Sequence, residues 1–451
     1  MMAEATPTQG SENVRAWKPK FTCIPGVAIA CMFIGYLLFI HAFVVNVPIH
    51  DEWNMLIFVE KYYHGTFDWS LLWGQYLENR MVVAQLLLLL LAKGTALNLT
   101  FEIYGSALVL ASEVGAVLVL FRTHGKKASW WGVAAAVLLF TLAQYEGTLW
   151  ALMVTNFITI ACAIWAVVIM RKPSYIGMVG ALLLGIVAVL STVEGFLVWP
   201  AVFIMLLIRS TSWKLRLLWI VSGLIVGGVY AIGYQFGGGR VGTEPFIAVL
   251  QHPLTSAAFF AALYGVPLSL GAVTSSHAIP AVLGGVVVVM ALGCVVYWWR
   301  NGRQDPQLTA GIACIVFALV YGCMVSLGRA PYGVGLAFVS RYVTYTVVIY
   351  VGILLVLASS WDNISRSVPR VSNQLVLGIG ILCCVQMIFS IRVGLLGGEA
   401  TSQADHHAVA LLHELDTLPL GAFHHTVFNN TGDYRDVARF LRAHQLSIWH
   451  Q

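Results

Sequence analysis

Long apolar segments alternate with short polar ones along almost the whole chain. A helix needs about 20 apolar residues to cross a bilayer, and eleven segments reach or approach that length. They are residues 25–47, 101–121, 129–144, 151–170, 175–191, 196–208, 217–234, 278–299, 308–328, 342–358 and 375–391. Another apolar stretch, residues 81–92, is shorter, and Gln85 interrupts it. The pattern predicts an all-α polytopic membrane protein with about eleven transmembrane helices.

The composition supports a membrane protein and gives no support for nucleic-acid binding, a disulfide framework or a zinc site. Apolar residues make up 59% of the 451 residues, charged residues only 10%, and the mean hydropathy is +0.82. A soluble domain carries about a quarter charged residues. The net charge of +5 does not indicate nucleic-acid binding, because Lys and Arg in such proteins mainly report orientation. The eight cysteines lack a CxxC or Cys/His spacing, so neither a disulfide framework nor a zinc site is supported.

The distribution of basic residues predicts the topology. If residues 81–92 do not cross the membrane, six basic clusters fall on one side, which is the cytoplasmic side by the positive-inside rule. The clusters are Arg15/Lys18/Lys20, Arg122/Lys126/Lys127, Arg171/Lys172, Arg209/Lys214/Arg216, Arg300/Arg303 and Arg366/Arg370. We therefore expect residues 81–92 to form an interfacial helix, with the N-terminus cytoplasmic and the C-terminus extracytoplasmic.

This topology divides the chain into three regions. Residues 1–24 form a cytoplasmic tail, and residues 25–391 form the transmembrane domain. Within that domain, residues 48–100 are a first outer loop with juxtamembrane helices, and residues 235–277 are a long outer loop. Residues 392–451 are a small extracytoplasmic region with a helix-like stretch at 434–444, and we expect this region to pack on the outer loops.

Two adjacent acids, Asp51 and Glu52, follow the first apolar segment. A carboxylate at a lipid interface is able to accept a proton from an incoming hydroxyl. The pair is also able to hold a divalent cation together with a phosphate, and no other cofactor follows from the sequence. The alternative is a solvated first turn of a helix, where acids are favourable.

Further polar residues lie in the expected outer loops. Arg80 and Arg341 are candidates for phosphate binding, as is Arg240, which follows three glycines whose amides can form an anion nest. Snorkelling to lipid headgroups is the alternative for Arg240 and Arg341. Glu78 and Asn79 are candidates for binding sugar hydroxyls, or else form a polar boundary with Arg80. Glu146 and Glu194 end two apolar segments, and Trp150 belongs either to an aromatic belt or to a sugar-stacking surface. Glu113 lies inside a span and is expected to be structural.

The order of these motifs resembles that of bacterial membrane glycosyltransferases of the GT-C superfamily. The resemblance covers most of residues 49–358. The motifs are Asp51-Glu52-Trp53, Glu78-Asn79-Arg80, Gln144-Tyr145-Glu146 with Leu149-Trp150, Ser191-Thr192 with Gly195 and Trp199-Pro200, and Ser340-Arg341-Tyr342 with Tyr345. Glu52 and Asn79 depart from the family pattern, which often has a second aspartate and a Glu-His-Arg-like triplet.

The resemblance implies a GT-C-like fold in the bacterial inner membrane and a sugar donor linked to polyprenyl phosphate. It implies an inverting transfer in which Asp51 is the base and Arg341, with Arg240 or Arg80, steadies the departing phosphate. The sugar is expected to be arabinofuranose or mannose, and the acceptor an extracytoplasmic glycan, lipid or pilin-like protein. Glu78, Asn79, Glu146, Trp150, Glu194 and Tyr342 are expected to contact the substrates.

Three other functions remain open from the sequence. A transporter or flippase would place charges along a path at the membrane midplane. A polymerase or ligase of surface glycans would rely mainly on arginines in a late outer loop. A non-catalytic assembly protein would tolerate the loss of Asp51 and of Arg341.

Overall fold

The protein folds entirely into helices in the part that the computed structural model describes, residues 23–122, 128–208, 211–235, 244–268, 277–428 and 432–450. The α-helices are α1 (Cys23–Phe43), α2 (Glu52–Tyr63), α3 (Val82–Thr95), α4 (Thr100–Phe121), α5 (Ala128–Leu139), α6 (Tyr145–Leu149), α7 (Val154–Ile169), α8 (Tyr175–Ser191), α9 (Val198–Leu206), α10 (Trp213–Ala231), α11 (Glu244–Gln251), α12 (Pro253–Gly265), α13 (Ala278–Tyr297), α14 (Pro306–Arg329), α15 (Val343–Ser367), α16 (Pro369–His413) and α17 (Arg435–Ala443). Short 3₁₀ turns include η1 (Trp69–Trp73), η3 (Leu142–Gln144), η4 (Ala151–Met153), η5 (Val193–Leu197) and η11 (Ser340–Tyr342).

Nine helical segments within these described ranges are long and apolar enough to cross a membrane. Each of the eleven predicted spans contains a helix, but α8 has 17 residues and α9 only 9. Both are shorter than a typical membrane-spanning helix of about 20 residues. The prediction of an all-α, multi-pass membrane protein is therefore confirmed, whereas the number eleven stays a prediction. The predicted interfacial segment is helical as α3, with 14 residues.

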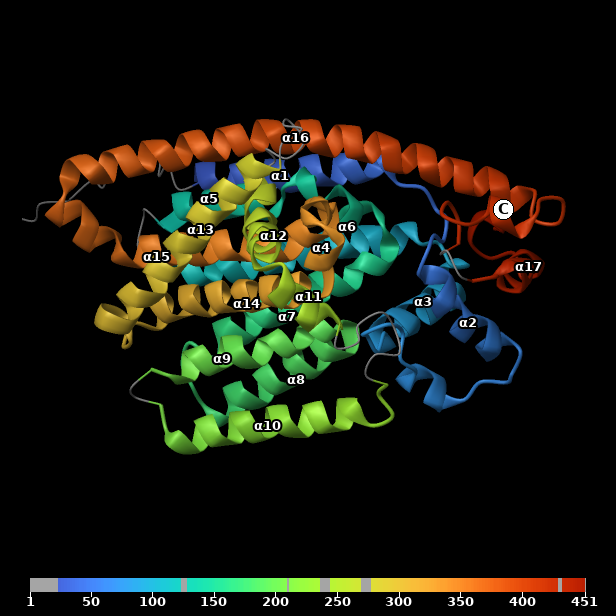
Figure 1. Ribbon diagram of the computed structural model, residues 1–451, viewed down its shortest axis with the longest axis horizontal. Coiled ribbons are helices and arrows are strands. Elements are labelled where there is room, and N and C mark those ends of the chain that lie inside the picture. The colour runs from blue at the N-terminus through green and yellow to red at the C-terminus, as the bar shows by residue number, and fades with distance from the viewer. Residues whose placement is uncertain are drawn as a thin grey trace, which may run out of the picture.

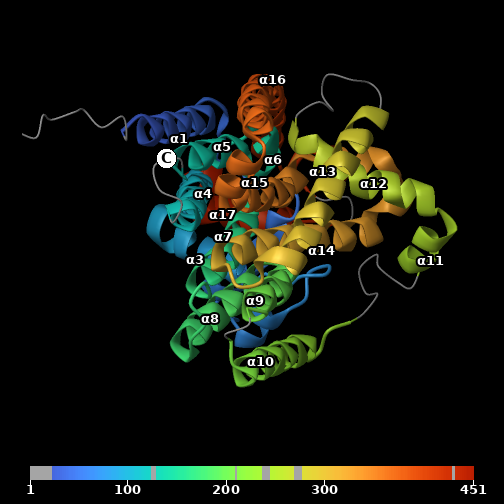
Figure 2. The same cartoon turned by 90° about the vertical axis from the view of Figure 1, so that its left-hand side faces the viewer.

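Helix α15 forms the centre of the bundle. It is buried along most of its length and packs against α14, α5 and α4, while α1, α10, α13 and α16 lie at the periphery (Figures 1 and 2). Gly311 of α14 faces Gly352 of α15, and a Cβ atom on Gly311 would lie 2.8 Å from the Gly352 carbonyl oxygen. Small residues at such a crossing let two helix backbones approach closely, which explains the tight α14–α15 pair.

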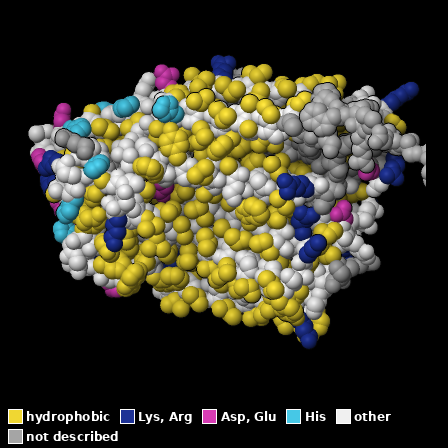
Figure 3. Space-filling model, turned by 180° about the vertical axis from the view of Figure 1, so that it is seen from behind, with side chains coloured by type: hydrophobic (Ala, Val, Ile, Leu, Met, Phe, Trp, Pro, Cys, Tyr) yellow, Lys and Arg dark blue, Asp and Glu magenta, His cyan; other side chains and the backbone are white. Residues whose placement is uncertain are grey.

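The surface has an apolar middle and two polar ends. On the face shown in Figure 3, hydrophobic side chains cover most of the area, Lys and Arg gather toward one end, and His side chains gather toward the other. An apolar band between two polar ends is the surface that a bilayer requires of a spanning protein.

Helix α16 is longer than the predicted span at residues 375–391. It has 45 residues, so at 1.5 Å per residue it is about 68 Å long, and it runs along the whole bundle (Figure 1). Ser390 anchors it, because its hydroxyl lies 2.8 Å from the Thr141 hydroxyl and accepts a hydrogen bond from the Leu142 amide at 2.7 Å. The predicted boundary between residues 391 and 392 thus lies inside one continuous helix.

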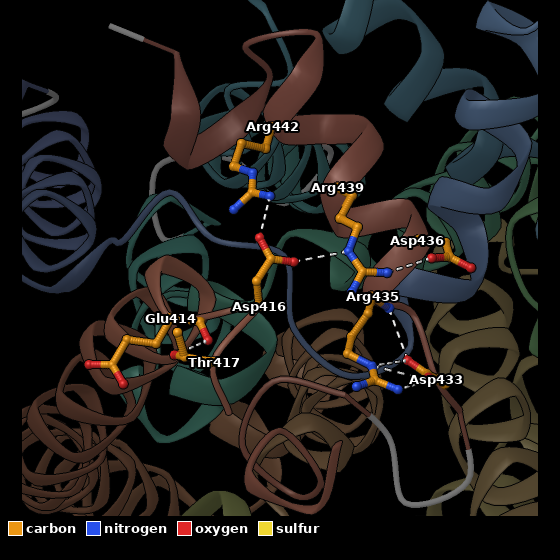
Figure 4. A network of polar contacts seen from close by, with 8 residues as sticks. All are labelled: Glu414, Asp416, Thr417, Asp433, Arg435, Asp436, Arg439 and Arg442. Carbon is orange, nitrogen blue, oxygen red and sulfur yellow. Dashed lines mark hydrogen bonds and ion pairs between the residues drawn. The ribbon is translucent and has the colours of Figure 1, made fainter. Parts of the chain in front are cut away.

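The C-terminal region packs against the first predicted outer loop. The His50 amide donates to the Val427 carbonyl at 2.8 Å, and the rings of Trp53 and Phe428 meet edge to face at 5.1 Å. The region is held internally by a network of exposed ion pairs around Asp416, shown in Figure 4: Arg439 with Asp416 and Asp436, Arg442 with Asp416, and Arg435 with Asp433. The chain end therefore fixes the segment that carries Asp51.

Candidate functional site

Asp51 stands at a sharp turn between α1 and α2. The preceding residue, His50, has a φ of +50°, a left-handed conformation that is uncommon for a residue with a side chain. The half-buried Asp51 is the N-terminal cap residue of α2. Its Oδ1 accepts a hydrogen bond of 2.5 Å from the Tyr76 hydroxyl. The turn and this bond fix the carboxylate at the surface of the site.

Arg341 is fixed by Glu146. Its Nη1 lies 2.7 Å from Glu146 Oε1, and about a third of each side chain is exposed. Ser340 brings the two segments together, because its hydroxyl accepts from the Glu146 amide at 3.2 Å and donates to the Ala143 carbonyl at 2.8 Å. The guanidinium carbon of Arg341 lies 5.9 Å from the ring centre of Trp150. Three predicted site residues therefore share one corner.

The Asp51 turn and the Arg341 corner lie close enough for their charges to interact. His50, next to Asp51, connects the two: its ring centre lies 5.9 Å from that of Trp150, and the Trp150 ring centre lies 5.9 Å from the guanidinium carbon of Arg341. Burial lowers the pKa of the His50 imidazole, the carboxylates of Asp51 and Glu146 oppose this effect, and Arg341 and His425 add to it.

A second polar group adjoins this corner. The charges of Glu78 and Arg329 act on Glu194. Tyr345 is also influenced by Glu194, and its hydroxyl donates to Asn156 Oδ1 at 3.3 Å. Its ring stacks on Tyr321 with 4.2 Å between the ring centres.

Contacts through His50 and Trp150 connect the predicted site residues at 51, 146, 150, 341 and 342. The hydrogen bond between Asn79 and Val193 brings the segments of Glu78 and Glu194 together. Tyr321 and His425 were not predicted. Tyr321 is an aromatic residue within an apolar span, and His425 is one of several histidines in the C-terminal region, so neither has a distinguishing sequence signal.

Glu52 faces away from Asp51 and into the protein. It is 1% exposed, and its two carboxyl oxygens accept hydrogen bonds from the backbone amides of Ile49 at 2.9 Å and Leu152 at 3.0 Å. Burial raises the pKa of Glu52 to about 8, although these two amides oppose the effect. In this geometry Glu52 joins the Asp51 turn to η4, and it does not contact the Arg341 corner through a hydrogen bond.

Arg80 is also engaged by the protein itself. It is 2% exposed, and its guanidinium donates to the carbonyls of Trp73, Tyr230 at 2.9 Å and Ile232 at 2.6 Å. Its guanidinium carbon lies 4.7 Å from the Trp73 ring centre. Three of the five N–H donors of this buried guanidinium are thus engaged by backbone carbonyls, and these bonds tie the first outer loop to the end of α10.

Asn79 has a similar fixing contact, since its Oδ1 accepts from the Val193 amide at 2.7 Å. The backbone carbonyl of Glu78 accepts from the hydroxyls of Tyr230 at 3.1 Å and Tyr234 at 3.2 Å. The half-buried side chain of Glu78 forms no hydrogen bond with a described residue, and its charge raises the pKa of Glu194. Arg240 lies outside the described residues, as does the predicted cytoplasmic tail up to residue 22.

No group of three or more His, Cys, Asp and Glu side chains among the described residues is arranged to hold a metal ion. With Glu52 turned inward and bound by two backbone amides, Asp51 is the half-buried member of the predicted acid pair.

Fold and composition define the class of this protein: it is an all-helical, multi-pass membrane protein. No family model matches the chain, and no curated protein matches it significantly.

Proposed function

We propose that this protein is a membrane glycosyltransferase that moves a sugar from a polyprenyl-phosphate donor to an acceptor outside the cytoplasm. The observation that supports the proposal is the link between Asp51 and Arg341, which are 290 positions apart in the sequence: the ring of His50, next to Asp51, contacts Trp150, which also borders Arg341. A base and a fixed guanidinium beside each other suit the transfer of a group away from a phosphate.

The proposed reaction is a single displacement with inversion. Asp51 accepts the proton of the acceptor hydroxyl while the hydroxyl oxygen bonds to the anomeric carbon of the sugar. The bond from that carbon to the phosphate oxygen breaks, and the polyprenyl phosphate leaves with the electron pair. Arg341 stabilises the departing phosphate. Glu146 holds only Nη1 of Arg341, and a guanidinium has five N–H donors, so donors remain for the phosphate.

Tyr76 and Glu146 have supporting roles in this proposal. The Tyr76 hydroxyl orients the Asp51 carboxylate through the 2.5 Å bond, and Glu146 orients Arg341. In this proposal the carboxylates of Glu78 and Glu194, whose segments are joined by the Asn79–Val193 hydrogen bond, bind sugar hydroxyls. Trp150 and Tyr342 flank Arg341, each with its ring centre 5.9 Å from the guanidinium carbon, and would border the phosphate site.

The location follows from the distribution of charge. Lys and Arg gather at one end of the apolar surface (Figure 3), and the positive-inside rule assigns that end to the cytoplasm. We infer that the Asp51 end faces outward from the bacterial inner membrane. A lipid-linked donor reaches such a site within the bilayer, whereas cytosolic nucleotide sugars do not. A reporter fused to the C-terminus, which lies at the Asp51 end (Figure 1), tests this orientation.

The test of the function compares Asp51→Asn with Glu52→Gln, two isosteric changes at adjacent positions. Surface glycans, lipids and pilins are analysed by mass spectrometry in cells that lack the protein and that express each variant. We expect a sugar modification to disappear without the protein, to fall by about 10²–10⁴-fold with Asp51→Asn, and to persist with Glu52→Gln. Full modification by a normally inserted Asp51→Asn protein would refute the role of Asp51 as base.

A proton-coupled transporter is the second candidate, and one observation favours it. Glu102 and Glu113 lie buried in α4, and their carboxyl oxygens have no hydrogen-bond partner among the residues that the structure describes. Buried acids within a span often belong to a proton path. Under this alternative, Glu113→Gln abolishes function and Asp51→Asn does not, so the same glycan analysis separates the two.

A further inference from the structure

A long apolar cavity lies between four helices, far from the candidate site. Its volume is about 660 Å³, and its lining includes Met32 of α1, Trp131 of α5, Trp361 of α15 and Gly380 of α16. Figure 2 shows α1 and α16 side by side above α5 and α15. Trp361 follows Arg341 by twenty residues, which is about 30 Å along α15 at 1.5 Å per residue. That distance equals the hydrocarbon thickness of a bilayer, so the cavity opens near the opposite membrane boundary.

The cavity is long enough to hold the part of a lipid chain that lies in one leaflet. Its lining on α16 extends from Asn373 to Met387, fourteen residues or about 21 Å. One leaflet contributes about 15 Å, half of the ~30 Å hydrocarbon core. The volume lies within the range of ligand pockets, about 300–1,000 Å³.

The surroundings determine what fills this space. The lining is mainly apolar, and an apolar cavity stays free of water. Helices α1 and α16, which form two of its walls, are among the least buried spans, so the cavity borders the part of the surface that faces lipid. A hydrocarbon chain is the molecule that is present at that surface in every membrane.

One end of the cavity carries positive charge. Asn373 lies at that end, and Arg370 stands one helical turn before it on the same face of α16. Arg366 lies in the last turn of α15. Both arginines are exposed, and neither forms an ion pair with a described residue. The first turn of α16 adds a favourable dipole for anions.

From these observations we propose that the cavity binds one acyl chain of an anionic phospholipid, with the phosphate beside Arg366 and Arg370. The lipid comes from the leaflet opposite Asp51. It fills the space between α1 and the bundle and thereby fixes α1 and α16 against α5 and α15. The proposal is independent of the glycosyltransferase function.

The test uses two glycines of α16 as a matched pair. A Cβ atom on either Gly378 or Gly380 meets no atom within 4 Å, and only Gly380 lines the cavity. Gly380→Phe fills the cavity, whereas Gly378→Phe adds the same bulk elsewhere on the same exposed helix. The full chain is reconstituted in phosphatidylcholine vesicles that contain a small fraction of phosphatidylglycerol with a photoreactive acyl chain. After irradiation, mass spectrometry locates and quantifies the labelled peptides.

We expect the label on the peptides that contain Trp131, Trp361 and Gly380. Gly380→Phe should reduce it severalfold, and Gly378→Phe should leave it unchanged. Arg366→Gln and Arg370→Gln should each weaken labelling about fivefold. Arg392→Gln, on the same helix but beyond the other end of the cavity lining and about 33 Å from Arg370, is the control for charge.

Three results would overturn the proposal. They are equal labelling of both glycine variants, equal labelling when photoreactive phosphatidylcholine replaces phosphatidylglycerol, and label spread evenly over all lipid-facing helices. Size-exclusion chromatography in detergent confirms that each variant is folded, so a loss of label is not mistaken for a loss of structure.

Discussion

Replacing Glu52 by glutamine should change how stability depends on pH. The buried carboxyl has an ordinary pKa of 4.5 and a pKa of about 8 in the folded protein, because burial disfavours its charged form. Between these two values the folded state keeps a proton that the unfolded state releases. This contribution to stability is therefore fully present below about pH 4.5 and is lost as the pH rises to about 8.

The size of the effect follows from the two values. Each pKa unit corresponds to about 1.4 kcal/mol, so the contribution that disappears by pH 8 is about 5 kcal/mol. Glutamine cannot lose a proton, but it has one acceptor oxygen where the carboxyl has two, so it accepts from only one of the Ile49 and Leu152 amides. One buried amide then lacks an acceptor, which costs about 1–3 kcal/mol at every pH.

The two effects predict that the stability curves cross. At pH 5 the Glu52→Gln protein should be less stable than the wild type, and at pH 9 it should be more stable. Thermal unfolding in detergent, followed by circular dichroism between pH 5 and 9, measures this difference. Subtracting the stability of one protein from that of the other at each pH cancels the contributions of all other titrating groups. Parallel curves would show that Glu52 is not the buried, protonated carboxyl that the structure indicates.

Four further substitutions test other contacts. Arg80→Gln should lower the free energy of unfolding by on the order of 3 kcal/mol, since it removes charge-assisted hydrogen bonds to backbone carbonyls. If the variant kept its melting temperature but no longer bound the sugar donor, Arg80 would instead be a ligand of the donor phosphate. Tyr76→Phe should lower kcat of the proposed transfer about tenfold at unchanged melting temperature, because Asp51 loses its orienting bond; unchanged kcat would exclude this role. Phe428→Ala should lower the free energy of unfolding by about 3–5 kcal/mol. Asp416→Asn should change the melting temperature little, since its ion pairs are exposed. A larger loss of stability in Asp416→Asn than in Phe428→Ala would show that the ion pairs hold the C-terminal region.

The helices were predictable where hydrophobicity alone decides them. The span at residues 342–358 is predictable because an uninterrupted apolar run has few structures available in a bilayer, and α15 continues nine residues beyond it to Ser367. Helix α16 shows the limit. The sequence assigns the polar residues after 391 to an extracytoplasmic region outside the span, yet the helix continues, Gly397 packs on the Tyr145 ring and Asp405 is buried. These tertiary contacts stabilise the helix there, and no local sequence pattern predicts them.

The candidate site was also predictable only in part. The common sidedness of Asp51 and Arg341 followed from counting spans and basic clusters, which are properties of the sequence. Their actual partners did not, because Glu146 and Arg341 are separated by 195 positions. The roles of Glu52 and Arg80 were not predictable either. A carboxylate or guanidinium that is bound by backbone groups has the same sequence signature as one that binds a ligand.

The pairing of Glu146 with Arg341 changes the role that the proposed reaction gives to Glu146. The sequence suggested a sugar ligand, but a carboxylate 2.7 Å from Nη1 acts first on the arginine. With about a third of each side chain exposed, the pair is weakly stabilising in itself, so its value lies in the orientation of the guanidinium. A phosphate arriving at Arg341 meets donors that already point in one direction, and little entropy is lost on binding. Under the proposed function Glu146 is therefore a positioning residue. Its amide variant should raise KM for the donor more than it lowers kcat, whereas loss of a sugar contact that forms only in the transition state would lower kcat alone.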